Sequence, residues 1–571
     1  MIAYDYETTN IAVGTPAPLY LTAYSPELHF ESRIDSIQHL HQLLTTNFLI
    51  PQFHGFKFVA WNGNRFDAYF VAAALIRDDT YIIRPYLTRS KTLRGLRVIL
   101  AEDINVKNPR GWEFLCGMAM LGLAGLSLEK FLDNFAPDHP KLVGAIDFEK
   151  ESFDPDNPQH RAYAMQDSVG LWHGMNRAQQ IMMQTFDEPL RVTMGGVCIR
   201  VFAAHIPRDV TVDPLIPDVH NLIFDYVMRG GFCYCNKRYS GPIWKYDINQ
   251  AYAAAMRDAR LPCGGLIRWK GAPLPEKCAI VLVTATNRAN KIPFYHRSFI
   301  DGRIKSLFSI KEIPETWITS IEYAQLKAEG WRVQVHDCYS WAKSFDMQEY
   351  VDKLEVLRTT CEGGPAGPIG TMVKATGNHS YGKTAEQVEP VEYVLAGECP
   401  DDFEPYFADG IDAAPIEHVY FKIDNERRPK AYQKPQLAAF ITAHVRMVLR
   451  RAALIDPDAW LYADTDCVVF SRDVTSDLDI DAKRYGAWKI EESGAVFDII
   501  AKKVYASADG KKRSAKGLNV KRLTLEDFKR WSDDKPPTQD QIQLQSFLQV
   551  MQGAEMFKTQ TRRGSRAEPQ K

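Results

Sequence analysis

The sequence lacks the features that usually mark membrane and secreted proteins. No run of about eighteen apolar residues occurs, which argues against a membrane-spanning helix. The chain enters a strand-like segment directly from Met1 to Tyr4, without a charged leader or a cleavage site, which argues against a signal peptide. We therefore expect a cytoplasmic protein.

Closely spaced cysteine pairs and a strong charge bias are also missing. Ten cysteines are scattered along the chain, only Cys233 and Cys235 lie near one another, and no Cys-x-x-Cys pair exists. This pattern favours free thiols in a reducing compartment over disulfides or a zinc site. The net charge is −2, so contacts with nucleic acid would require local basic patches.

The overall composition is that of an ordinary globular protein, with 45% hydrophobic and 25% charged residues. At 571 residues the chain is too long for a single core. Length therefore predicts roughly three to five structural units. Composition alone does not separate a polymerase from a metabolic enzyme.

The segment from Leu461 to Phe470 is the most informative part of the chain. Two apolar, strand-like runs flank Asp464-Thr465-Asp466, which predicts a β-hairpin with two acids at its tip. Residues two apart on an extended chain share a face, and close carboxylates must be hydrated, protonated or bridged by a cation. Hard oxygen ligands of this kind suit Mg²⁺. Taken alone, a plain surface turn explains the segment equally well.

A second set of acids lies in the N-terminal third of the chain. Asp5 and Glu7 share one face of a predicted strand, and Asp67 lies on a predicted helix after a Gly-containing turn. Tyr163 and Asp167 lie four residues apart on one helix face. Such acids could converge on two metal ions, which activate water in phosphodiester hydrolysis. For any single acid, an unrelated surface position is the simpler interpretation.

Three further patterns lie between these two sets of acids. Asp247 lies where a predicted strand leads into a helix, and Arg229-Gly-Gly offers a flexible backbone beside a cation. Lys374, Asn378 and Tyr381 fall at helical spacings of four and three, so they share a face. The cation could pair with a triphosphate and the ring could pack on a base. A solvated basic face is the simpler interpretation of the lysine alone.

In this order, the motifs resemble those of family B DNA polymerases. Asp-x-Glu, Asn-x-x-x-Phe-Asp and Tyr-x-x-x-Asp resemble the three exonuclease motifs of that family. Asp-Ile-Asn-Gln-Ala-Tyr resembles polymerase motif A, Lys-x-x-x-Asn-His-x-Tyr-Gly resembles motif B, and Lys-Val-Tyr resembles the Lys-x-Tyr motif. Nine short motifs occur in family order. Chain length, the Arg-Gly-Gly region and two insertion positions favour the small protein-primed branch, as in tectivirus-like phages and linear plasmids.

The resemblance implies an α/β multidomain (α+β) fold, in which an RNase H-like 3′-5′ exonuclease domain precedes a right-hand polymerase with two insertions. The first insertion would contact a priming protein, although a plain surface subdomain explains it equally well. The second would clamp the template for strand displacement. The implied ranges are 1–185 for the exonuclease domain, 186–260 and 433–510 for the palm, 261–345 and 387–432 for the insertions, 346–386 for the fingers, and 511–571 for the thumb and tail.

In the exonuclease domain, the resemblance implies that the metal ligands are Asp5, Glu7, Asp67 and Asp167. Tyr163 would orient the attacking water, while Asn62 and Phe66 would hold the 3′ end of single-stranded DNA. Family members carry a lysine just before a Gly-x-Ile-Asp stretch. Here Val143 stands at that position and Lys141 lies two residues earlier, so whether Lys141 replaces it stays open.

In the polymerase part, the resemblance implies a metal site formed by Asp247, Asp464, Asp466 and the carbonyl of Ile248. Tyr252 would stack under the sugar and exclude a 2′-hydroxyl. The implied nucleotide contacts are Arg358, Lys374, Asn378, Tyr381 and Lys503, and the implied DNA contacts are Arg229, Gly230, Gly231 and Lys516. The sequence departs from the family pattern at Met228, Gln250, His379 and Cys467.

The implied activity is DNA-templated nucleotidyl transfer with 3′-5′ proofreading, using two Mg²⁺ ions per site, with Mn²⁺ as an alternative. The implied partners of this monomer are template and primer DNA, dNTPs and a terminal protein, during replication of a linear phage or plasmid genome in the host cytoplasm. Three alternatives stay open. They are an oligonucleotide-primed family B polymerase, a reverse transcriptase-like enzyme, which would carry Asp-Asp and no N-terminal exonuclease series, and a non-catalytic DNA-binding scaffold.

Overall fold

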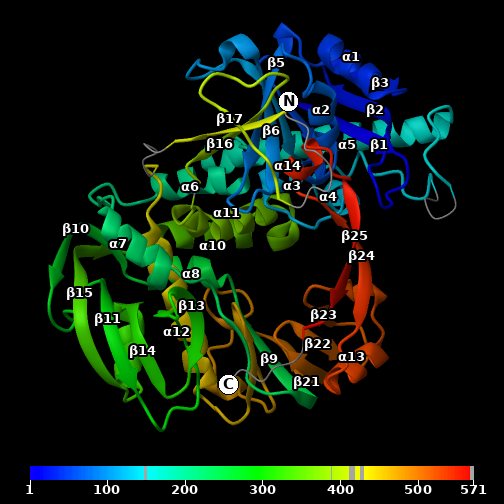
Figure 1. The fold of residues 1–571 in the computed structure, drawn as a ribbon. Coiled ribbons are helices and arrows are strands. Elements are labelled where there is room, and N and C mark those ends of the chain that lie inside the picture. Colours follow the sequence, from blue (N-terminus) through cyan, green and yellow to red (C-terminus); the bar gives the residue numbers. More distant parts are fainter. Residues whose placement is uncertain (147–150, 388, 410–417, 425–429, 566–571) are drawn as a thin grey trace.

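The computed structural model describes residues 1–146, 151–387, 389–409, 418–424 and 430–565. Within these ranges, every cysteine is a free thiol. None of the helices in the described parts of the chain is long and apolar enough to cross a membrane. The chain folds into an N-terminal unit, a palm sheet, a helical layer between them, and smaller sheets at the periphery (Figure 1).

The N-terminal unit is built on a mixed sheet that has ten strands among the described residues, in the order β17-β18-β16-β5-β6-β7-β4-β1-β2-β3. Its central strand β1 pairs antiparallel with β2 and parallel with β4. The first strands are β1 (Ile2–Thr8), β2 (Pro18–Ser25), β3 (Leu28–Arg33), β4 (Lys57–Ala60), β5 (Tyr81–Leu87), β6 (Leu93–Leu100) and β7 (Gly111–Cys116). Its helices are α1 (Ile37–Asn47), α2 (Asp67–Leu75), α3 (Gly117–Leu121), α4 (Leu128–Phe135) and α5 (Pro158–Phe186).

The palm is an antiparallel sheet of seven described strands in the order β23-β22-β21-β9-β20-β19-β8. Helices α8 (Ala251–Asp258) and α12 (Pro435–Ala453) pack against each other beside it. Most of α12 is buried, and the buried residues include Arg446 and Arg450 beside its many apolar ones. The strands are β8 (Cys233–Cys235), β9 (Tyr239–Ile248), β19 (Trp460–Asp464), β20 (Cys467–Phe470), β21 (Trp488–Ala501), β22 (Val504–Ser507) and β23 (Arg513–Ala515).

A separate sheet follows the first palm helix, in the order β10-β15-β11-β14, beside the hairpin β12-β13 and helix α9. It occupies one lower edge of the molecule (Figure 1). Its α9 contacts palm helix α12. The elements are β10 (Leu261–Trp269), β11 (Ala279–Thr286), β12 (Phe294–Ile300), β13 (Arg303–Ser309), β14 (Glu312–Thr319), α9 (Ser320–Ala328) and β15 (Arg332–Phe345).

The range predicted for the fingers contains two helices, α10 (Gln348–Thr360) and α11 (Pro368–Thr384). A Gly/Pro-rich segment ends the first helix, because these residues do not continue helical geometry easily. Helix α11 packs on α6 (Met194–Ala204), and this helical layer lies between the N-terminal unit and the palm (Figure 1).

Two late segments return to the N-terminal unit. Strand β16 (Val391–Leu395) pairs with β5 through Leu395 and Ile83, and β18 (Val419–Ile423) and β17 (Glu404–Pro405) extend that edge. The C-terminal segment contains α13 (Leu525–Ser532), β24 (Thr538–Leu544), α14 (Phe547–Met551) and β25 (Phe557–Arg563). Its β24-β25 hairpin reaches from the palm side to the N-terminal unit, where α14 packs on α2 (Figure 1).

Candidate active sites

The predicted acidic hairpin is present and lies beside the third palm acid. Strands β19 and β20 pair with Asp464 opposite Cys467, and Cys467 in turn lies opposite Asp247 on β9. The backbone N–H of Ile248 donates to the carbonyl of Asp466 at 2.9 Å. Strand β9 and the β19-β20 hairpin, more than 200 residues apart in the sequence, therefore bring their acids together.

The environment of Asp247 and Asp466 disfavours the ionised forms of these two acids. Burial raises the pKa of Asp466 to about 6, and the nearby charges of Asp247 and Asp464 act in the same direction. Burial also raises the pKa of Asp247, although a hydrogen bond from Lys489 opposes that shift. Carboxylates crowded in this way are suited to binding cations.

Lysines already contact two of these acids. Lys503, a predicted nucleotide contact, places Nζ 3.3 Å from Asp464 Oδ2. Lys489 places Nζ 2.9 Å from Asp247 Oδ1 and 3.5 Å from Glu491 Oε1. Sequence reasoning missed Lys489 and Glu491. Their spacing of two on β21 puts them on one face, but no local signal gives the strand with which β21 pairs.

Two tyrosines form a wall next to the acids. The rings of Tyr252 on α8 and Tyr381 on α11 are stacked, with centroids 4.6 Å apart. Gly231 lies against this wall, since a Cβ atom on it would be 2.7 Å from the Tyr252 hydroxyl and 2.9 Å from Cα of Thr465. The N–H of Thr465 donates to the carbonyl of Phe232 at 2.8 Å. The predicted glycine motif is thus in direct contact with the hairpin tip.

The predicted triphosphate contacts lie on the fingers helices. Lys374 and Asn378 are exposed on α11, about two turns and one turn before the half-buried Tyr381. Arg358, in the last turn of α10, forms a side-chain hydrogen bond with Tyr485. These residues therefore lie in the helical layer between the N-terminal unit and the palm, and their contact with a triphosphate stays a prediction.

The Arg229 side chain lies inside the protein, where DNA does not reach. It is fully buried, with Nη2 2.6 Å from Glu322 Oε1 and Nη1 donating to the carbonyl of Tyr295 at 2.9 Å. Arg446 donates to the carbonyls of Arg229 and Gly230. The prediction that the Arg229 cation contacts DNA is therefore wrong, because its charge serves an internal ion pair. That Gly230 and Gly231 contact DNA stays a prediction.

Lys516, the predicted primer contact, is exposed after β23. Its backbone N–H donates to the carbonyl of Lys503 at 3.0 Å. Lys503 and Lys516 are therefore neighbours, although they lie 13 positions apart in the sequence.

Three of the four N-terminal acids converge. Carboxylate oxygens of Asp5, Glu7 and Asp167 all lie within 4.8 Å of one another. The fourth, Asp67, accepts a hydrogen bond from the N–H of Tyr6 at 3.2 Å, and it lies outside that three-acid cluster. Strand β1 and helix α5 thus bring together the carboxylates that the sequence places more than 150 residues apart.

Burial and mutual repulsion shift these N-terminal acids strongly. Burial raises the pKa of Asp5, and the charges of Glu7, Asp67 and Asp167 raise it further. Glu7 reaches a pKa of about 8 and Asp67 a pKa of about 7, both mainly through burial. The buried Oδ1 of Asp167 has no hydrogen-bond partner among the described residues. A free acceptor beside two further carboxylates fits a divalent cation.

Lys141 reaches this acid cluster. Its ammonium contacts the carboxylate of Asp167 and lies 4.6 Å from the ring centroid of Tyr163. Burial lowers the pKa of Lys141, but the charge of Asp167, the neighbouring Tyr163 and the hydrogen bonds to both together raise it overall. The geometry therefore places Lys141, two residues before the position expected from the family pattern, among the acids.

The two predicted strand-holding residues lie at the edge of the N-terminal unit. Asn62 has a left-handed backbone (φ 65°) and lines a large cavity. The ring of Phe66 packs against Phe70 at 5.1 Å and against Phe557 of the C-terminal segment at 6.4 Å, between centroids. The C-terminal segment is therefore part of the wall beside this site.

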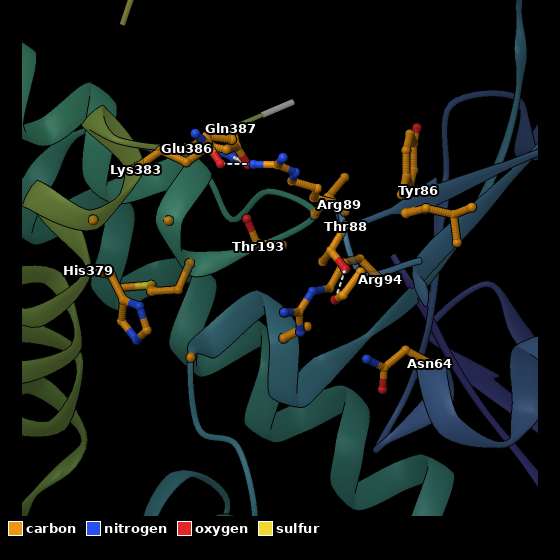
Figure 2. A pocket seen from close by; sticks show the side chains of 18 of the residues that line it. Asn64, Tyr86, Thr88, Arg89, Arg94, Thr193, His379, Lys383, Glu386 and Gln387 are labelled. Atoms are coloured by element: carbon orange, nitrogen blue, oxygen red, sulfur yellow. Dashed lines mark hydrogen bonds and ion pairs between the residues drawn. The ribbon is translucent and has the colours of Figure 1, made fainter. Parts of the chain in front are cut away.

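A cavity of about 2230 Å³ connects the two regions, from Asn62 to Asn378, Tyr381 and Gly230. In Figure 2, Arg89 reaches across to Gln387, with Arg94 on the same side of the cavity as Arg89. Basic side chains outnumber acidic ones in its lining. The basic residues are Arg65, Arg84, Arg89, Arg94, Arg297, Lys383 and Lys430, and the acidic residues are Glu386, Glu389, Glu392 and Asp424.

Comparison with known proteins agrees with this geometry. The family model described as DNA polymerase type B, organellar and viral, matches residues 145–401. The DNA-directed DNA polymerase of Enterobacteria phage PRD1 is 24% identical over 393 residues, which is 66% of each chain. A probable DNA polymerase of Neurospora intermedia is 20% identical over 374 residues, 60% of this chain and 37% of that protein. The matched region thus spans about two thirds of the phage relative and less of the fungal one.

Solved structures extend the likeness over the whole length. Phi29 DNA polymerase complexed with primer-template DNA and incoming nucleotides has a TM-score of 0.73 and 18% identity, covering 100% of this chain and 99% of that one. An orthorhombic crystal form of phi29 DNA polymerase gives 0.70 and 18% identity, covering 92% and 94%. The predicted α/β multidomain fold is confirmed. The predicted resemblance is confirmed as well: the chain has the fold of phi29 DNA polymerase, and residues 145–401 match the model of the type B DNA polymerases of organelles and viruses.

Proposed function

We propose that the chain is a DNA-directed DNA polymerase whose palm site is formed by Asp247, Asp464 and Asp466. The observation that carries the proposal is the register of β9, β20 and β19, which places these acids together at one end of the sheet. The stacked tyrosine pair beside them supplies a flat apolar wall for a nucleotide. The match of residues 145–401 to type B DNA polymerases supports the same function.

The palm residues fit two divalent cations. Hard carboxylate oxygens, with the carbonyl of Ile248, match the ligands that Mg²⁺ prefers, and Mn²⁺ accepts the same set. When bound, the ions would neutralise triphosphate charge and make the attacking 3′-hydroxyl more acidic. The raised pKa of Asp466 fits this role, because a divalent ion stabilises the ionised carboxylate that burial penalises.

The protein itself positions the nucleotide. Lys374 and Arg358 supply cations from two fingers helices, which can pair with a triphosphate. Tyr252 lies between Gly231 and Tyr381, so its ring is fixed and can exclude a 2′-hydroxyl on steric grounds. Lys503 and the neighbouring Lys516 supply positive charge for the primer strand.

We also propose a 3′-5′ exonuclease in the N-terminal unit. Asp5, Glu7 and Asp167 would hold the divalent ions, with Asp67 completing the set. Tyr163 and Lys141 lie against Asp167. There they can orient the attacking water and stabilise negative charge on the phosphate under attack. Replacing Lys141 with methionine is expected to lower 3′ trimming at least tenfold, whereas unchanged trimming would remove this lysine from the site.

The basic cavity is proposed as a passage for single-stranded DNA. It runs from Asn62, a proposed exonuclease contact, to Gly230 and Tyr381 near the palm acids. Residues of the second insertion, including Tyr393, also line it. A positively charged channel with aromatic side chains suits a strand bound without sequence preference. This arrangement fits template clamping and strand displacement.

We infer that priming uses a protein hydroxyl, for replication of a linear phage or plasmid genome by a monomeric polymerase. Residues 261–345 form a separate sheet at the palm edge, which offers a docking surface for a terminal protein. This inference follows the family resemblance. Adding a candidate terminal protein, Mg²⁺ and labelled dNTP is expected to give a labelled protein adduct. If no candidate is labelled while an oligonucleotide is extended, the enzyme is oligonucleotide-primed.

The polymerase proposal is tested on a primed DNA template supplied with one dNTP at a time. The expected result is extension only by the complementary nucleotide, dependent on Mg²⁺ or Mn²⁺. Extension of the same primer on an RNA template but not on DNA would favour a reverse transcriptase-like enzyme. Binding of primed DNA with no extension under any divalent ion would favour a non-catalytic scaffold.

A further inference from the structure

Four charged side chains alternate along one face of the palm sheet. Lys489 lies opposite Asp247 in the pairing of β21 with β9, and its Nζ is 2.9 Å from Asp247 Oδ1. The same Nζ is 3.5 Å from Glu491 Oε1. The other oxygen, Oε2 of Glu491, is 2.7 Å from Nζ of Lys245. The order Asp247, Lys489, Glu491, Lys245 therefore forms a ladder of opposite charges beside the proposed metal site.

The contact between Lys489 and Asp247 occupies one of the two oxygens that this carboxylate offers to a metal ion. A Mg²⁺ ion lies about 2.0–2.1 Å from a carboxylate oxygen. An ammonium group that stays about 3 Å from the same oxygen would then lie within a few ångströms of a divalent cation. Like charges so close repel strongly in a partly buried site, and the Asp247 side chain is only 17% exposed. The Lys489 ammonium and a divalent ion therefore weaken each other's binding to the Asp247 carboxylate.

The ladder also provides the lysine with another partner. The Lys489 stem is flexible and 37% exposed, so the ammonium can move without repacking a core. Glu491 Oε1 already faces it, while Lys245 holds Oε2 in place. A small shift of the Lys489 ammonium toward Glu491 Oε1 would transfer the ion pair from Asp247 to Glu491.

We infer that Lys489 is a tethered cation that competes with the divalent ion for Asp247 and so sets the metal concentration at which the palm site fills. The inference rests on the proposed polymerase function. Lys489 acts as a positioning residue: it holds Asp247 in place when no metal is bound and shifts to Glu491 when metal binds. Lys503 differs, because its partner Asp464 lies on the other side of Cys467 and no second acid is placed beside it by the contacts of the described residues.

The test measures Mn²⁺ binding directly, by the loss of the free-ion signal in electron paramagnetic resonance. All variants carry Asp5→Ala and Glu7→Ala, so that the N-terminal acids do not contribute. Lys489→Met keeps the length of the side chain and removes its charge, and Lys489→Arg keeps the charge. Lys512→Met is the matched control. Lys512 pairs with Glu492, which lies on the same strand as Lys489, and its side chain is 60% exposed.

Lys489→Met is expected to bind Mn²⁺ about five- to tenfold more tightly, and to reach half-maximal extension at a correspondingly lower Mg²⁺ concentration. Lys489→Arg and Lys512→Met are expected to match the parent protein. A structural ion pair alone would instead lower the melting temperature of Lys489→Met and leave its Mn²⁺ affinity unchanged or weaker. That result would overturn the inference.

A further variant separates this inference from the proposed function. Asp247→Ala in the same background is expected to lose the palm Mn²⁺ site and primer extension together. If Asp247→Ala keeps both, the palm assignment fails and the inference fails with it. If Asp247→Ala loses both while Lys489→Met leaves Mn²⁺ affinity unchanged, only the role of Lys489 is overturned.

Discussion

Gly231 and Thr465 are in van der Waals contact, and a Cβ atom on Gly231 would lie only 2.9 Å from Cα of Thr465. Thr465 is the residue between the two acids of the palm hairpin, and its backbone is left-handed (φ 61°). The contact therefore fixes the hairpin tip against the segment that contains Gly230 and Gly231. Any side chain at position 231 would push against backbone atoms, which yield less easily than a flexible side chain.

Gly231→Ala is expected to lower primer extension at least tenfold, because the added methyl group displaces the hairpin tip or Tyr252. The strain is expected to reduce the free energy of unfolding by about 1–3 kcal/mol. Gly230→Ala is the matched control, since no atom lies within 4 Å of a Cβ at that position. Single-nucleotide extension and urea unfolding measure both effects. Equal behaviour of the two variants would contradict the contact.

Asp5→Ala combined with Glu7→Ala is expected to abolish 3′ trimming of single-stranded DNA and to leave primer extension within about twofold. The physical reason is the loss of two of the three converging carboxylates, at a site formed by different elements from the palm site. Trimming of a labelled oligonucleotide without dNTPs measures the first effect. Undiminished trimming would reject the N-terminal assignment.

The metal-free protein is expected to become less stable as the pH rises from 5 to 8. Glu7, Asp67 and Asp466 have folded-state pKa values of about 8, 7 and 6, all above those of unfolded carboxyl groups, mainly through burial. The folded protein thus binds more protons than the unfolded chain across this range. Its free energy of unfolding falls with rising pH, by about 1 kcal/mol per pH unit for each acid until the pH passes the folded-state pKa of that acid.

Urea unfolding in EDTA at several pH values tests this expectation. Added Mg²⁺ is expected to flatten the pH dependence, because bound metal stabilises the ionised carboxylates. Glu7→Gln is expected to flatten it in the absence of metal. A metal-free protein whose stability rises between pH 6 and 8 would contradict the assignment of these pKa shifts.

Glu322→Gln is expected to destabilise the fold by about 3–5 kcal/mol, since it leaves two buried arginines without their shared carboxylate. Burial raises the pKa of Glu322, but the charges of Arg229 and Arg446 outweigh it and keep the pKa low. Asp301→Asn, at an exposed pair with Lys305, is expected to change stability by less than about 1 kcal/mol. Chemical unfolding compares the two. A loss at Glu322 no larger than at Asp301 would refute the role of the buried triad.

Local patterns predicted the elements that carry the acids. Strand alternation placed Asp5 with Glu7, helical spacing placed Tyr163 with Asp167, and the two apolar runs around Asp464 gave the hairpin. Each of these relationships joins residues within a few positions of one another. Periodicity encodes such short-range geometry directly, which is why it could be inferred without a structure.

Contacts between residues that lie far apart in the sequence could not be predicted in this way. No local signal pairs Lys489 with Asp247, because strand partners depend on the assembled sheet. Arg229 was expected to face DNA, yet its partner Glu322 comes from the insertion that follows the palm helix. The return of Phe557 to the N-terminal unit likewise depends on tertiary packing between distant segments.

The central claim is that the palm acids, and not the N-terminal acids, add nucleotides to a primer. Single-nucleotide extension and 3′ trimming are measured in parallel for Asp466→Ala and for the unaltered protein, with the same Mg²⁺ and labelled primer-template. Asp466→Ala is expected to lose extension by at least a thousandfold and to retain trimming. Extension that persists in Asp466→Ala, or trimming that disappears with it, would contradict the account.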